Sequence, residues 1–145
     1  MKRLINIFVL TLILTTSCNG QQIMKTLSVN DAKKLKINKE RFINKPLKEL
    51  LLEIHPKIKM VTARSSGGEG AGRFSFRFVD LNQDHKIGEK GKTSLRITVY
   101  IKEAFVWDNK KSLDGKKLGW DKEDEKTYGN LTVIGIDVSG EEVNQ

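Results

Sequence analysis

Residues 73–80, Arg-Phe-Ser-Phe-Arg-Phe-Val-Asp, and residues 94–102, Ser-Leu-Arg-Ile-Thr-Val-Tyr-Ile-Lys, decide the fold of this chain. In both stretches apolar and polar side chains alternate, and this period of two is typical of a strand with one buried face and one wet face. A polar segment joins the two stretches, so the pattern predicts an antiparallel hairpin. The apolar face of that hairpin needs a cover.

A helix predicted over residues 45–55 supplies the cover. Asn44 and Pro46 are residue types that favour the start of a helix, and Pro56 ends it. Apolar side chains recur between these limits at helical spacing: Leu47, Leu50, Leu51 and Ile54. Packing this stripe on the hairpin buries both apolar surfaces.

Two further strands complete the predicted sheet. Residues 58–64 precede a glycine-rich loop, and residues 131–138 carry apolar side chains on both sides, which favours a central or well-covered position. The polar stretch over residues 108–130 is long for a loop in a compact domain, which points to a further element within it. The sequence therefore predicts an α+β fold of two layers, with about four antiparallel strands and one main helix packed on one face.

The N-terminal segment is typical of an export signal. Lys2 and Arg3 give a basic start, residues 4–14 are mostly apolar, and the three small polar residues 15–17 lead into Cys18, the only cysteine. The end of this segment resembles the lipobox of bacterial lipoproteins. That resemblance implies that Cys18 receives lipid and becomes the first residue after cleavage.

Three segments follow from the resemblance: a signal peptide over residues 1–17, the lipidated cysteine and a linker over residues 18–30, and a single domain over residues 31–145. The apolar run of the signal is too short to cross about 30 Å of hydrocarbon as a helix. We therefore expect an exported protein that lipid holds on a bacterial membrane, facing the periplasm. With Cys18 lipidated, the domain has no thiol left for a disulfide.

Positive charge is concentrated close to the predicted anchor. The chain has 26 Lys and Arg against 18 Asp and Glu, and residues 25–59 hold ten of the basic residues against four acidic ones. This segment could be drawn to anionic lipid headgroups, or its lysines could simply solvate a helix surface, which the interleaved acidic residues favour. Nucleic acid is not an expected partner, because an exported chain does not meet it and no recognised binding motif is present.

The segment between the two decisive strands is the best candidate for a metal site. Asp80, Asn82 and Asp84 occupy positions 1, 3 and 5 of a loop that resembles an EF-hand, and the resemblance implies calcium binding by their oxygens. His85 replaces the glycine of position 6, and Gly91 replaces the glutamate of position 12. The alternative, which the sequence favours, is a polar hairpin turn, because Asp, Asn and Gly favour turns for backbone reasons alone.

Tryptophan and histidine residues offer weaker candidates. Trp107 follows an apolar segment and is predicted to lie in the core, whereas Trp120 is the candidate for anchoring a protein or glycan partner. His55 and His85 could act as a base near neutral pH, but nothing in their spacing pairs either of them with a serine.

Three hypotheses for function follow. The first is a membrane-anchored, non-enzymatic binding or assembly module, without a cofactor, for a protein or glycan partner. The second is a calcium-binding module that uses residues 80–91, and the third is a hydrolase. Neither the ligand nor the partner has a recognisable signature in the sequence.

Overall fold

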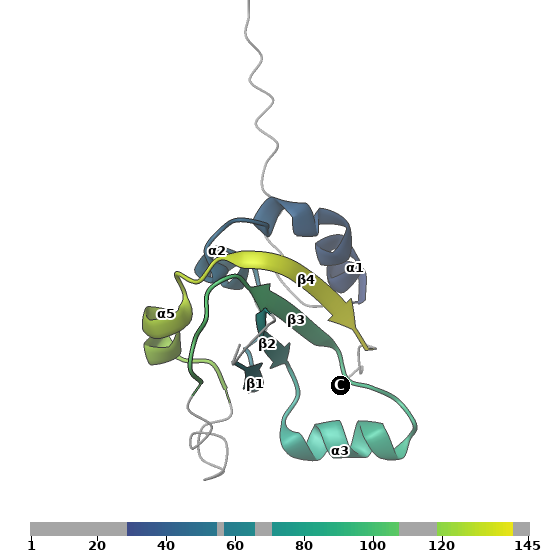
Figure 1. The fold of residues 1–145 in the computed structure, drawn as a ribbon. Helices are drawn as coiled ribbons and strands as arrows, with labels where there is room; N and C mark the ends of the chain where they lie inside the picture. The colour runs from purple at the N-terminus through teal and green to yellow at the C-terminus, as the bar shows by residue number, and fades with distance from the viewer. Residues whose placement is uncertain (1–28, 55–56, 66–70, 108–118, 141–145) are drawn as a thin grey trace, which may run out of the picture.

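The computed structural model describes residues 29–54, 57–65, 71–107 and 119–140. Its elements are α1 (Val29–Asn38), the 3-10 helix η1 (Lys39–Phe42), α2 (Leu47–Glu53), β1 (Met60–Arg64), β2 (Gly72–Arg77), α3 (Leu81–Glu89), β3 (Arg96–Ile101), α5 (Lys122–Tyr128) and β4 (Val133–Ser139). The strands form an antiparallel sheet in the order β1-β2-β3-β4 (Figure 1). The predicted α+β fold with four antiparallel strands is confirmed.

Alternation in β2 and β3 produces the buried face of the sheet, as predicted. Phe74 pairs with Val99 and Phe76 pairs with Ile97, and all four side chains are fully buried. β1 adds Val61 opposite Phe76 on the same face. Because residues paired across strands share a face, one row of apolar side chains runs across three neighbouring strands.

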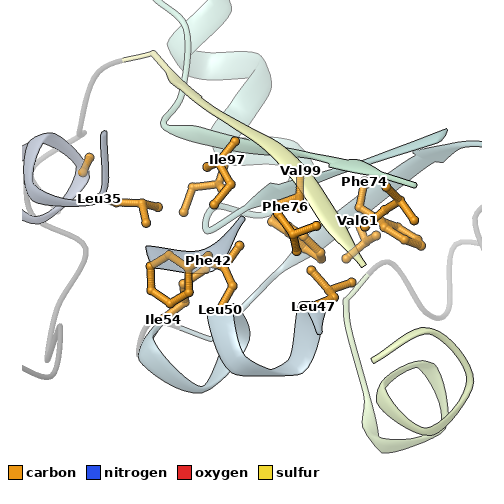
Figure 2. Packing of buried hydrophobic residues seen from close by; sticks show 14 of the residues in the cluster. Leu35, Phe42, Leu47, Leu50, Ile54, Val61, Phe74, Phe76, Ile97 and Val99 are labelled. Carbon is orange, nitrogen blue, oxygen red and sulfur yellow. The ribbon is translucent and has the colours of Figure 1, made fainter. Parts of the chain in front are cut away.

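The cover over this face consists of three short helical elements, α1, η1 and α2, rather than one helix. α2 begins at Leu47, with Pro46 in the cap position, and buries Leu47 and Leu50 completely. α1 adds Leu35, which is 1% exposed, and η1 adds Phe42. Figure 2 shows these side chains between the helical segment and the sheet. The helix predicted over residues 45–55 is therefore confirmed, within somewhat narrower limits.

Of the two positions predicted for β4, central or well covered, the central one is wrong, because β4 lies at the edge of the sheet. Its outer edge is nevertheless covered at the start, because Asn44 donates to the Val133 carbonyl (2.8 Å) and Val133 donates to the Lys45 carbonyl (2.9 Å). The apolar residues on both sides reflect a register shift opposite Tyr100 and Ile101. Ile134 is left 41% exposed there, next to the fully buried Val133.

The segment after β2 is a helix, so the prediction of a hairpin turn over residues 80–91 is wrong. Asp80 caps α3 by accepting from the Gln83 backbone N–H (2.9 Å), and the Gln83 side chain accepts from the Asp80 backbone in return. This reciprocal capping box satisfies amide groups at the helix start that would otherwise lack partners. A polar connection of this composition is therefore stable as a helix.

The long polar stretch before β4 also contains a helix, as its length indicated. Asp121 and Asp124 form a second capping box at the start of α5. Part of the stretch, residues 108–118, lies outside the described residues, as do the predicted signal peptide and Cys18. No helix in the described part of the chain is long and apolar enough to cross a membrane.

Candidate functional site: the open face of the sheet

The face of the sheet turned away from α1 and α2, here called the open face, carries a concentration of arginines. Strand pairing places Arg64 opposite Arg73, and Arg77 opposite Arg96. Ser75 lies opposite Thr98 in the row between these two pairs. The arginine set, as we call it, consists of Arg64, Arg73, Arg77 and Arg96.

Arginine is selectively placed on this face, whereas lysine is not. The chain contains six arginines: Arg3, Arg41, Arg64, Arg73, Arg77 and Arg96. Four of these six form the arginine set, and the four strands of the described sheet contain no lysine. A guanidinium group presents several donors in a planar fork that matches a carboxylate or phosphate, which the ammonium group of lysine cannot do. The arrangement therefore points to oxyanion recognition.

The Arg64–Arg73 end of the open face is exposed to solvent. Like charges placed directly opposite each other across two strands are destabilising. Among the described residues, neither arginine has an acidic partner within ion-pair distance. Both guanidinium groups are thus available to an external anion.

The Arg77–Arg96 end is partly covered by α3. Asp84 on this helix lies 3.1 Å from Arg77 Nη1 through one carboxylate oxygen, and accepts a hydrogen bond from the Ser94 hydroxyl through the other. Burial lowers the pKa of Arg96, as does the neighbouring Arg77 charge, while Asp84 opposes both effects. The Nε atoms of Arg77 and Arg96 are buried and have no hydrogen-bond partner. Two guanidinium groups therefore share one carboxylate.

A polar strip separates the two arginine pairs. The hydroxyl groups of Ser75 and Thr98 lie 3.0 Å apart, and Tyr100 stands opposite Arg73 on β3. Tyr100 packs over Gly135 of β4, where an added Cβ would lie 3.2 Å from its ring. Asp137 on β4 adds an exposed carboxylate at the margin, opposite Thr98. On the open face of β1 to β3, positively charged side chains therefore outnumber negatively charged ones, and hydroxyl groups lie between the two arginine pairs.

The three proposed calcium ligands do not converge, because their segment is helical rather than a loop. Asp80 caps α3, Asn82 is exposed on its first turn, and Asp84 binds Arg77 and Ser94. In the ranges that the structure describes, no group of three or more His, Cys, Asp or Glu side chains is placed to hold a metal ion. The calcium hypothesis thus loses the loop geometry that motivated it.

The two tryptophans both pack against Phe74. The predicted core role of Trp107 is confirmed, because its ring meets Phe74 edge-on with centroids 5.5 Å apart. Trp120, the predicted partner anchor, is half-buried and meets Phe74 and Phe76 edge-on at 5.6 and 5.4 Å. Much of its ring thus serves the core, and its binding role stays a prediction. His55 lies outside the described residues, and His85 is exposed on α3.

Up to Glu53, the described part of the basic segment over residues 25–59 forms α1, η1 and α2, whereas Lys57 and Lys59 lie between α2 and β1. Several of its cations pair with local acidic residues: Lys34 with Asp31 at 3.2 Å, Arg41 with Glu53 at 3.1 Å, and Lys45 with Glu49 at 3.7 Å. The cation of each pair is largely exposed, although Asp31 is mostly buried, and ion pairs at the surface typically contribute only about 0–1 kcal/mol. The interleaved pattern agrees with a solvated helix surface.

Comparison with known proteins returned no relative: no family model matches the chain, and no curated protein or solved structure matches it. The open face is therefore interpreted from its geometry. The alternation within β2 and β3 predicts from the sequence alone that Arg77 and Arg96 lie on the solvent-facing side of their strands. The grouping of all four arginines required the pairing register, which the sequence pattern does not specify.

Proposed function

We propose that this protein is an exported lipoprotein that lipid on Cys18 holds on a bacterial membrane, and that it binds an anionic partner on the open face. The observation that carries the binding function is the register that gathers the arginine set. Each arginine pair can contribute forked, charge-assisted hydrogen bonds, which are about twice as strong as neutral ones. The lipobox resemblance supports the anchor.

The arrangement of charges supports one orientation on the membrane. The exposed lysines Lys36 and Lys48 lie on α1 and α2, which cover the opposite face of the sheet. Lysines near anionic headgroups contribute about 1 kcal/mol each to membrane attraction. We propose that this helical side turns toward the headgroups and leaves the open face directed away from the bilayer, toward its partner.

Labelling with a radioactive or alkyne-bearing fatty acid in a bacterial host tests the anchor. We expect the wild-type chain to incorporate the label and to sediment with membranes. Cys18→Ser should abolish incorporation, because the thiol is the attachment point, while Ser17→Ala, which keeps a small residue before the cysteine, should retain it. Label on the Cys18→Ser variant, or none on the wild-type chain, would contradict the lipoprotein proposal.

A further inference from the structure

We infer that the partner of the open face is a protein surface rich in Asp and Glu carboxylates, which docks flat across β1 to β3. This inference rests on the proposed binding function and specifies its ligand. It combines three observations on this face: the separation of the two arginine pairs, the absence of lysine from its strands, and the incomplete use of the Arg77 and Arg96 donors.

The spacing requires an extended ligand. Arg73 and Arg77 are four residues apart on β2, which corresponds to about 13 Å between their Cα atoms at strand rise. A free phosphate or acetate can contact one arginine pair at a time. A folded surface that carries several carboxylates can contact both pairs and also bond to the half-buried Ser75 hydroxyl between them.

The choice of arginine over lysine favours a protein partner over a lipid surface. Headgroup attraction depends on net charge, to which lysine and arginine contribute alike. Protein interfaces, by contrast, are enriched in arginine and tyrosine and depleted in lysine. The strands of the open face present four arginines and Tyr100 without a lysine, in a chain where lysine is the far more common cation.

The Arg77–Arg96 end, which α3 partly covers, offers a reason why a carboxylate-rich partner would bind. Asp84 is shared between its ion pair with Arg77 and its electrostatic interaction with Arg96, and the Nε donors of both arginines lack partners. Asp84 is the one carboxylate that faces both guanidinium groups among the described residues, so a second carboxylate brought by a partner would add negative charge where two cations share one anion.

An octaglutamate peptide is a suitable probe, with octaglutamine as the uncharged control. The full chain carrying Cys18→Ser, which removes the lipid attachment point, would be titrated with each fluorescently labelled peptide at low and physiological salt. Vesicles of phosphatidylglycerol and of phosphatidylcholine form the second arm. We expect octaglutamate to bind, octaglutamine not to bind, and the affinity to fall as salt rises.

Three variants tie the binding to this face. Arg73→Gln should weaken octaglutamate binding by about tenfold, as expected for the loss of a charged hydrogen bond. Arg73→Lys keeps the charge but loses the fork, so it should weaken binding as well. Lys126→Gln, which removes the same charge from the exposed surface of α5, should leave the affinity unchanged.

Two results would overturn the inference. One is an equal loss of octaglutamate affinity in Lys126→Gln and Arg73→Gln, which would mean that the peptide responds only to the overall charge of the protein. The other is phosphatidylglycerol binding that Arg73→Gln abolishes while octaglutamate does not bind, which assigns the face to lipid instead. Loss of acylation with octaglutamate binding intact would remove only the lipid anchor, so the two proposals fail separately.

Discussion

At the scale of single residues, Glu103 shows how one carboxylate can join two parts of the sheet. It follows β3, and its side chain accepts from the backbone N–H of Thr132 at 2.7 Å and from the Thr132 hydroxyl, just before β4. Burial alone would raise the pKa of Glu103, but these hydrogen bonds outweigh burial and lower it. The ionised form is therefore the form that stabilises the fold.

Glu103→Gln should make the folded state less stable at neutral pH. A carboxyl group whose pKa is lowered by folding contributes stability above its ordinary value of 4.5, and this contribution is lost as the pH falls through the lowered value. Chemical unfolding at several pH values should show a gap between wild type and variant that closes in that acidic range. Glu89→Gln removes an exposed carboxyl from α3 as the control, and a gap that persists below the acidic range would contradict the assignment.

At the scale of the element, α3 depends on Asp80, the cap residue that precedes it. Asp80→Ala removes the acceptor for the Gln83 backbone N–H and should lower the free energy of unfolding by about 1 kcal/mol. Asp80→Asn should retain most of the stability, because asparagine also caps helices well. Asn82→Ala, at an exposed position, is the matched control. If Asp80→Ala has no more effect than Asn82→Ala in urea titrations, the cap does not hold this helix.

The strands could be predicted from the sequence, but both capped helices were harder to recognise, for a physical reason. β2 and β3 alternate because one face is buried, and burial leaves a clear period in the sequence. α3 buries only Ile87 among its nine residues, so it carries little hydrophobic pattern. Its signature is the spacing of Asp80 and Gln83, which is compatible with a turn as well. The capping box therefore determines that this segment forms a helix rather than a turn.

At the scale of the whole molecule, the arginine set on the open face forms only when β1, β2 and β3 are paired in register. Arg64 and Arg73 flank a glycine-rich segment, and nothing in either strand alone indicates that they stand opposite each other. Arg96 joins Arg77 across the helical connection α3. The candidate site could thus be predicted residue by residue as polar positions, but not as a cluster, because register is a property of the folded sheet.

The arrangement of like charges also makes a prediction about stability. If the arginine set serves binding rather than folding, the isolated protein bears its repulsion, so the double variant Arg64→Thr, Arg73→Thr should be more stable than wild type by about 0.2–1 kcal/mol. The gain should shrink as salt rises, because both side chains are exposed. Arg41→Gln, the control, removes a cation that pairs with Glu53 and lies over the Phe42 ring, and should give no gain. Thermal unfolding at low and high salt measures all three proteins, and a destabilised double variant would show that these arginines support the sheet itself.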